Sequence, residues 1–177
     1  VYFGQEVGEA GHEDAGFGKP SRTSIFDYIG VPNHQRWMNN GKFDGGQLSQ
    51  SEKNLRDFYK RLLNFSIKSP ALMGQFQEIQ TPNRKGTDGY DAGIYSYVRW
   101  SGNQKLIVVA NFSADKESTF ELKIPVAIIS KWNLKDGVYQ LTDQLYLKDK
   151  TKLNVINGKG TAKIKIAPSE SFIYEVK

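Results

Sequence analysis

The sequence predicts a mainly β protein, in which residues 74–177 form an antiparallel two-sheet β-sandwich of about eight strands. Three observations support this prediction. Apolar and polar residues alternate with a period of two from about residue 74 onward. The connections between the alternating segments are short, so neighbouring strands must run antiparallel. The 10 phenylalanines and 9 tyrosines, with β-branched runs late in the chain, favour strands over helices.

Residues 1–48 are irregular in pattern and rich in glycine, asparagine and aspartate. We predict that "VYF" at the start is the end of a buried strand, which runs into a glycine-rich loop. Gly4 and Gly8 permit tight turns there. The remainder reads as a long structured loop, because its aromatic residues argue against disorder.

Residues 49–66 form the clearest helix of the sequence. Ser49 and Glu52 match a capping box, in which each side chain accepts a hydrogen bond from the backbone amide of the other residue. Apolar residues then recur at helical spacing along one face: Leu55, Phe58, Tyr59, Leu62 and Leu63. Charged residues cover the other face, and the helix stops before Pro70. A stripe of this strength requires a large apolar partner.

The strand candidates follow one another with turn sequences such as "SGNQ", "KDG" and "NGKG" between them. They cover residues 75–80, 94–100, 104–112, 118–124, 127–130, 138–146, 152–156, 161–166 and 171–176. "KLIVVANF" is apolar on both faces and is therefore expected to be a central strand. Pro125 and Pro168 lie at strand ends, where proline is tolerated.

Composition excludes several classes of function. The chain has no cysteine, which rules out a disulfide scaffold, a zinc–thiolate site and a thiol nucleophile. The net charge is +5, but the lysines are scattered along the sequence, and we expect a solvated basic surface rather than a nucleic-acid-binding protein. No apolar run approaches the ~20 residues needed to span a bilayer.

The order of six segments resembles the C-terminal portion of an α-amylase-family enzyme, glycoside hydrolase family thirteen. These segments are "VYFGQEVG", "RTSIFDY", "QRWMNNGKFDGG", "LRDFYKRLLNFSIKSPALMGQF", "YSYVRW…KLIVVANFS" and "IAPSESFIYEV". The resemblance implies that residues 1–73 are the end of a (β/α)8 catalytic barrel, with its last strand, a long loop and its last helix. Residues 74–177 would then be the β-sandwich called domain C.

The resemblance also implies what this stretch lacks. The catalytic carboxylates of the family precede the last barrel strand, so we assign no catalytic residue and expect these residues alone to be inactive. The intact enzyme would act with retention on α-glucans such as starch or maltooligosaccharides, and a secreted, periplasmic or cell-surface location would fit the family. We expect no cofactor or metal site in these residues, although the intact enzyme could carry calcium on ligands elsewhere.

Four residues are candidate substrate contacts: Glu6, Tyr28, Arg36 and Trp37. Glu6 follows the predicted strand, at the end where barrel enzymes place their active sites. The alternative role for Glu6 is a structural acid satisfied by backbone amides. The other three lie in the loop that the resemblance places near the cleft, where rings would stack on sugar faces. For Tyr28 and Trp37 the alternative, which we favour, is a satellite core that holds the long loop together.

Two tryptophans of the sandwich, Trp100 and Trp132, are candidates for an accessory glucan-binding platform. Packing in the core or against a barrel is the commoner fate of such residues and is the preferred interpretation.

A rival hypothesis is a non-catalytic carbohydrate-binding β-sandwich with an N-terminal helical arm. A self-sufficient module has no use for a strong amphipathic helix and a lone buried strand. We therefore expect residues 1–73 to be covered by the remaining barrel or by a second chain.

Overall fold

The computed structural model describes residues 1–11, 30–147 and 150–177. The chain divides into two compact units, Val1–Asn64 and Phe65–Lys177. The helical elements are η1 (Gln5–Val7), α1 (Pro32–Met38), η2 (Asn39–Gly41), α2 (Gln50–Lys68), η3 (Pro70–Met73), α3 (Gln80–Gly86) and α4 (Val126–Lys131). The strands are β1 (Gln75–Glu78), β2 (Ile94–Ser101), β3 (Gln104–Asn111), β4 (Ser118–Ile124), β5 (Gly137–Asp143), β6 (Lys150–Ile156), β7 (Lys159–Ile166) and β8 (Ser171–Val176). Among the helices described, none is long and apolar enough to cross a membrane.

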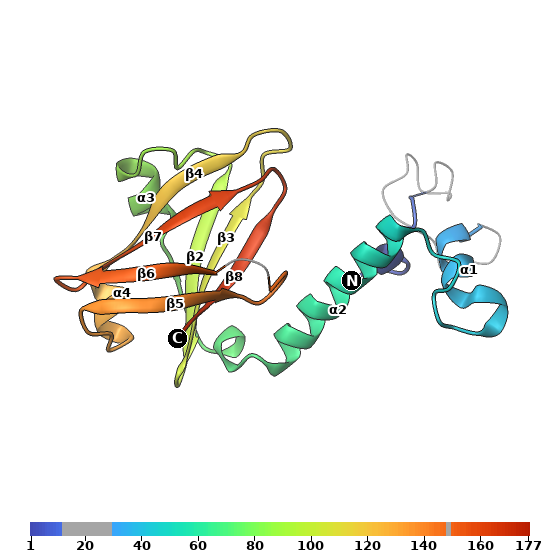
Figure 1. The fold of residues 1–177 in the computed structure, drawn as a ribbon, viewed down its shortest axis with the longest axis horizontal. Coiled ribbons are helices and arrows are strands. Elements are labelled where there is room, and N and C mark those ends of the chain that lie inside the picture. Colours follow the sequence, from blue (N-terminus) through green and yellow to red (C-terminus); the bar gives the residue numbers. More distant parts are fainter. Residues whose placement is uncertain (12–29, 148–149) are drawn as a thin grey trace. The chain divides into compact units, whose positions relative to one another are not determined.

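The eight strands of the second unit form one antiparallel sheet in the order β1-β2-β3-β8-β5-β6-β7-β4. The sheet curls over itself, so that β5, β6, β7 and β4 cross in front of β2, β3 and β8 (Figure 1). A short run of pairs joins the two halves, with Leu141–Asp143 on β5 paired to Tyr174–Val176 on β8. The predicted β-sandwich is therefore confirmed, with its two expected sheets hydrogen-bonded into one.

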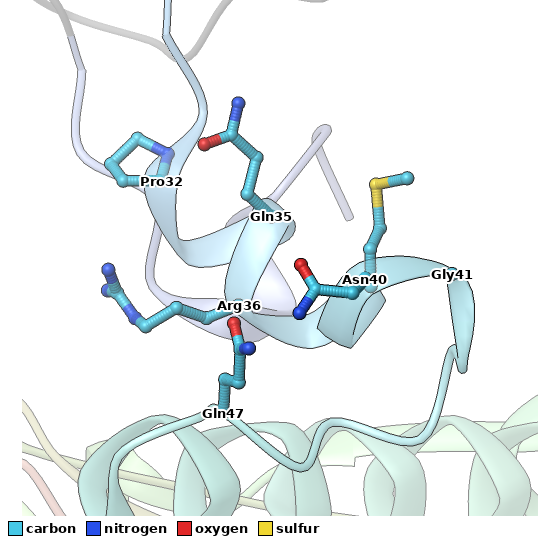
Figure 2. Close-up of a pocket in the computed structure, with 7 residues that line it drawn as sticks. Pro32, Gln35, Arg36, Asn40, Gly41 and Gln47 are labelled. Carbon is cyan, nitrogen blue, oxygen red and sulfur yellow. The ribbon is translucent and has the colours of Figure 1, made fainter.

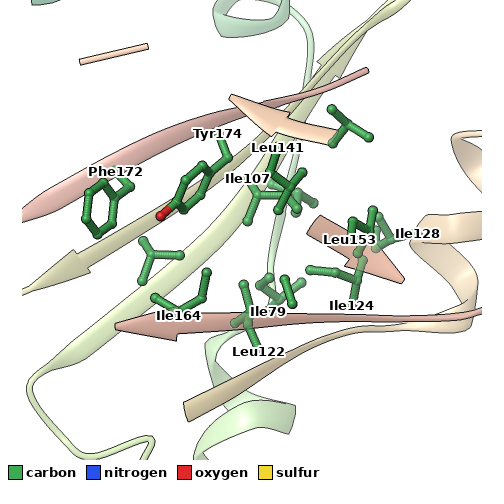
Figure 3. Close-up of a cluster of buried hydrophobic side chains, with 14 of the residues drawn as sticks. Ile79, Ile107, Leu122, Ile124, Ile128, Leu141, Leu153, Ile164, Phe172 and Tyr174 are labelled. Atoms are coloured by element: carbon green, nitrogen blue, oxygen red, sulfur yellow. The ribbon is translucent and has the colours of Figure 1, made fainter. Parts of the chain in front are cut away.

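The core lies between the two halves of this sheet. Side chains from both halves meet there, among them Ile107 on β3, Leu141 on β5 and Ile164 on β7 (Figure 3). Each of these three is at most 1% exposed. Alternation explains the arrangement, because every second residue of β4 and β7 is buried and the residues between them face outward. Strand β3 pairs with both β2 and β8, which confirms the prediction of a central strand.

Residues 127–130 are not a strand, as the sequence pattern suggested, but part of helix α4. The backbone amides of Ile128 and Ile129 both donate to the carbonyl of Pro125, at 2.9 and 3.2 Å. One helical turn thus places two adjacent isoleucines in the core, each at most 2% exposed, which an extended strand would direct to opposite faces.

Helix α3 lies beside the edge of the sheet and is held there by one buried asparagine. The Asn83 amide donates to the carbonyls of Ile79, at 2.7 Å, and Lys123, at 2.9 Å. Its oxygen accepts from the backbone amide of Lys123 at 2.8 Å. Asn83 thereby satisfies backbone groups of β4, and its own side chain is completely buried.

The first unit begins with a turn and the short helix η1, not with the strand predicted for "VYF". Gly4 and Gly8 flank η1 in the left-handed conformation, with φ of 72° and 73°. A Cβ atom on Gly4 would lie 2.7 Å from the Cβ of Glu9, so the chain folds back tightly at this point. Two left-handed glycines four residues apart interrupt the extended conformation that a strand needs.

Helix α2 confirms the prediction of a capped amphipathic helix. The backbone amide of Ser49 donates to the Glu52 carboxylate at 2.8 Å, and the Glu52 amide donates to the Ser49 hydroxyl at 3.3 Å. These two bonds are the capping box that the sequence predicted. None of the 19 residues of α2 is fully buried, although a long apolar stripe runs along it.

Candidate functional site

The first unit is organised around the carboxylate of Glu9, which is 9% exposed. One oxygen of this carboxylate accepts hydrogen bonds from the backbone amides of Asn33 and His34, both at 3.0 Å. These amides belong to the first turn of α1 and have no partner within the helix. Glu9 therefore ties the N-terminal turn to α1 by satisfying the helix start.

Asn33 continues the connection between the N-terminal turn and α1. Its amide nitrogen donates to the carbonyls of Val7 and Gly8, at 3.0 and 2.9 Å. Its oxygen accepts a hydrogen bond from the guanidinium of Arg36 one turn farther along the helix.

Arg36 links α1 to the start of α2 through an ion pair with Glu52. The Nε of Arg36 donates to one carboxylate oxygen at 3.3 Å, and an Nη contacts the other oxygen. This two-point geometry fixes the plane of the guanidinium. The hydrogen bond with Arg36 is the main cause that lowers the pKa of Glu52 from 4.5 to about 2, with help from Ser49. The same bond raises the pKa of Arg36.

Trp37 lies at the centre of an aromatic cluster in the first unit. Its ring is 5.5 Å from the ring of His34 and 5.9 Å, edge-on, from that of Phe43. His34 in turn stacks on Phe3 at 4.8 Å. The guanidinium carbon of Arg56 lies 5.3 Å from the centre of the Trp37 ring, within the range of a cation–π contact. These contacts agree with the interpretation of Trp37 as part of a satellite core.

A hollow of about 460 Å³ with a mixed polar and apolar lining lies along one side of α1. Its lining consists of Pro32, Gln35, Arg36, Met38, Asn40, Gly41 and Gln47. Figure 2 shows side chains of Gln35, Arg36 and Asn40 around it, with Gln47 reaching in from the segment before α2. Three side-chain amides and one guanidinium supply both donors and acceptors, the groups that bind sugar hydroxyls.

A second hollow, of about 280 Å³, lies on another side of α1. Trp37 and Arg56 line it together with Asp44, Gly45, Leu48, Gln50, Lys53 and Asp57. Arg36 and Trp37 are neighbours in sequence, but successive residues of a helix are about 100° apart around its axis. The two candidates therefore face different hollows and do not form one site.

The other candidates of the first unit have separate positions. Glu6 is a half-buried residue of η1. Tyr28 lies outside the residues that the structure describes. Glu9, which organises the start of α1, was not singled out from the sequence. A fold-back at Gly4 that brings an acid to a helix start depends on contacts between distant residues, and no local sequence motif marks it.

In the second unit, Trp132 is 4% exposed and belongs to the hydrophobic core. It packs edge-on against the half-buried Trp100, with 6.4 Å between ring centres. The idea of an exposed pair of rings is therefore wrong for Trp132, because α4 turns it inward over the core. Trp100 is partly accessible, and the Lys131 ammonium lies 5.7 Å from the centre of its ring.

Within the described ranges, no group of three or more metal-ligating side chains is close enough to hold a metal ion. The residues His12, Glu13 and Asp14, which are adjacent in sequence, lie outside these ranges.

We compared the chain with family models, curated proteins and solved structures. No family model and no curated protein matches the chain. Among solved structures, a noncanonic maltogenic α-amylase, AmyB from Thermotoga neapolitana, matches 99% of the chain with a TM-score of 0.57 and 16% identity. The fold of the chain is therefore similar to part of this α-amylase.

A variant of AmyP, solved in complex with maltotriose, matches 75% of the chain with a TM-score of 0.51 and 22% identity. The chain spans 32% of the length of AmyB and 22% of that of AmyP. At these identities the likeness establishes the fold alone.

Proposed function

We propose that this chain is the C-terminal part of a retaining, α-glucan-active glycoside hydrolase of the α-amylase type. In this proposal residues 1–73 complete a catalytic (β/α)8 barrel and residues 74–177 are domain C. The observation that carries it is the match to a maltogenic α-amylase over 99% of the chain, with a TM-score of 0.57. The sequence motifs support it independently, because they follow one another in the order that the family has.

Hydrolysis of a glycosidic bond with retention requires two carboxyl groups about 5–5.5 Å apart. The family resemblance assigns both of them to earlier barrel strands. We therefore propose that the 177 residues contribute structure and substrate contacts and are inactive by themselves.

The larger hollow beside α1, which Arg36 lines, is the best candidate for a sugar contact in these residues. The ion pair with Glu52 and the bond to Asn33 hold the Arg36 guanidinium in place before a ligand arrives. A donor that is already fixed loses little conformational entropy on binding a sugar hydroxyl. Trp37 would hold α1, and with it Arg36, in position through its aromatic contacts. Glu6 and Tyr28 are proposed as further contacts with the substrate.

The size and activity of the native protein test this proposal. An antibody raised against residues 74–177 should detect a native species several times longer than 177 residues that hydrolyses maltooligosaccharides. The purified 177-residue chain should release no sugar from the same substrate. A native species of only 177 residues would contradict the proposal.

The rival function, a carbohydrate-binding module, makes a different prediction for the same chain. A module would be retarded by soluble starch in an affinity gel without any further protein, and Trp100→Ala would abolish the retardation. Trp100 is the ring to test, because Trp132 is buried in the core. Under the proposed function, the migration of the 177-residue chain should not depend on Trp100.

A further inference from the structure

Three aromatic side chains lie in a row on the face of β1 and β2 that points away from the core. Residues of β2 alternate between the core and this outward face, and Tyr95 and Tyr97 lie on the outward side. Phe76 of β1 pairs with Arg99 of β2, which places it on the same side. The Phe76 side chain is 52% exposed, and both tyrosines are half-buried. We call Phe76, Tyr97 and Tyr95 the aromatic row.

The rings of the aromatic row follow one another at nearly equal spacing. The centre of the Tyr97 ring lies 5.4 Å from that of Phe76 and 5.6 Å from that of Tyr95. This spacing is close to the length of one glucose unit in a glucan chain. The apolar C–H face of a sugar packs on an aromatic ring, so successive sugar units can contact successive rings of the row.

The tilt of the rings distinguishes between kinds of glucan. The ring planes differ by 42° between Phe76 and Tyr97, and by 45° between Tyr97 and Tyr95. A flat ribbon, such as a β-1,4-linked glucan, cannot lie against two neighbouring rings at once. An α-1,4-linked glucan turns from one unit to the next and can follow the tilt. The ring planes therefore favour an α-linked chain.

The phenol hydroxyls of the aromatic row are open to a ligand. Among the residues that the structure describes, neither the Tyr95 nor the Tyr97 hydroxyl has a hydrogen-bond partner within 3.5 Å. By contrast, the hydroxyl of the buried Tyr90 is bonded to that of Ser96 at 2.8 Å. An apolar protein surface laid over the row would leave both hydroxyls unpaired, at a cost in free energy. A sugar would instead supply hydroxyls that pair with them.

The charged neighbours of the aromatic row balance each other. Glu78 pairs with Tyr97, and Arg99 pairs with Phe76. The Arg99 guanidinium lies 6.0 Å from the centre of the Phe76 ring and donates to two backbone carbonyls at 3.3 Å, which hold it in place. Nucleic-acid binding depends on an excess of basic groups that neutralise phosphates. A row flanked by one acid and one base suits a neutral polymer.

We infer that the aromatic row binds an α-1,4-linked glucan, with successive glucose units packed on its three rings and hydrogen-bonded to its two hydroxyls. The paired strands hold the rings in position before the ligand arrives, which lowers the entropic cost of binding. The row belongs to the second unit, whereas the proposed sugar contact at α1 belongs to the first. The inference stands whether or not the chain is part of a glycosidase.

Titration calorimetry of the full chain with maltoheptaose tests the inference, with cellohexaose as the β-1,4-linked comparison. We expect measurable affinity for maltoheptaose and an affinity at least about tenfold weaker for cellohexaose. Phe76→Ala should weaken maltoheptaose binding about tenfold, and the fold should tolerate it because Phe76 is exposed on an edge strand. Tyr95→Phe with Tyr97→Phe, which keeps the rings and removes the hydroxyls, should weaken binding about threefold.

The matched control is Tyr2→Ala, which removes a ring that is 46% exposed in the first unit. An equal loss of maltoheptaose binding in this control would overturn the inference. So would binding that Arg36→Ala abolishes and Phe76→Ala leaves unchanged, because the ligand would then lie at α1. Trp100 packs on the core side of β2, so Trp100→Ala should leave the affinity within about twofold, which separates the aromatic row from the rival module.

Three further results would overturn the inference: no binding of maltoheptaose, equal affinity for cellohexaose, or tighter binding of a single-stranded oligonucleotide. None of them bears on the proposed function, which is tested separately by the size and activity of the native protein.

Discussion

The interactions that stabilise the first unit differ from those that stabilise the second. The second unit, Phe65–Lys177, encloses a continuous apolar core between the halves of its curled sheet. The first unit, Val1–Asn64, has only two large apolar residues that are buried among its described residues, Val7 and Leu48. Its order comes from polar links, namely Glu9 to α1, Asn33 to the N-terminal turn and Arg36 to Glu52, together with the aromatic cluster around Trp37.

This difference indicates which of the two units can fold stably by itself. Burial of apolar surface is the dominant favourable term in folding, whereas a single net hydrogen bond contributes only about 0.5–1.5 kcal/mol. A curled sheet with a closed core can be stable alone. A unit with a partly exposed helix stripe and few buried side chains would gain stability from further apolar cover, which the proposed barrel would supply.

The largest expected effect is on the core of the second unit. Leu141 is completely buried where β5 meets β8, so Leu141→Ala removes apolar contacts between the halves of the sheet. We expect a loss of about 2–5 kcal/mol in the free energy of unfolding, measured by chemical denaturation of the full chain. A loss below about 1 kcal/mol would show that the halves do not share one core.

A smaller effect should follow from Asn83→Ala, which tests whether one polar anchor matters in the unit with the apolar core. The substitution leaves the backbone amide of Lys123 and the carbonyl of Ile79 without their buried partner. We expect a loss of about 1–3 kcal/mol, measured in the same way. Asn83→Asp should cost at least as much as alanine, because a buried carboxylate oxygen would then face the carbonyls of Ile79 and Lys123 that now accept from the amide.

Acid should weaken the first unit through Glu52. Its pKa is about 2 in the folded chain against an ordinary value of 4.5, so the ionised carboxylate stabilises the fold above pH 4.5. That stabilisation is lost as the pH falls from 4.5 toward 2. The indole NMR signal of Trp37, on α1 beside Arg36, reports the loss.

The control for this titration is Glu52→Gln, which cannot ionise. Subtracting its titration from that of the unchanged protein leaves the contribution of Glu52, because the other acids are common to both. Identical acid titrations of the two proteins would contradict the structural role of the Arg36–Glu52 pair.

The smallest expected effect concerns the stripe of α2. Leu63 is 43% exposed, so Leu63→Ala should change the free energy of unfolding by less than about 1 kcal/mol. Chemical denaturation followed by the helical circular dichroism signal measures it. A cost equal to that of Leu141→Ala would mean that the stripe is already covered in this chain.

Sequence reasoning succeeded where the determinants are local. The alternation of apolar and polar residues predicted the eight strands that the structure describes. The pattern of Ser49 and Glu52 predicted the start of α2. It failed where distant contacts decide. Residues 127–130 have a strand composition, yet α4 forms there because a helical turn places both Ile128 and Ile129 in the core.

The candidate site shows the same division. The sequence drew attention to Arg36 and Trp37, but the helix directs them into different hollows. The fold-back that brings Glu9 to the start of α1 depends on contacts between residues that are distant in sequence.

Thermal unfolding of residues 69–177 by themselves tests the contrast between the units most directly. This piece keeps Ser69 and Ala71, which are buried and bonded to Gln104 of β3. We expect one cooperative transition within about 5 °C of the sandwich transition in the full chain, since the core is intact. A piece without a cooperative transition, or one that melts far below the full chain, would show that the sandwich depends on the first unit and would contradict this explanation.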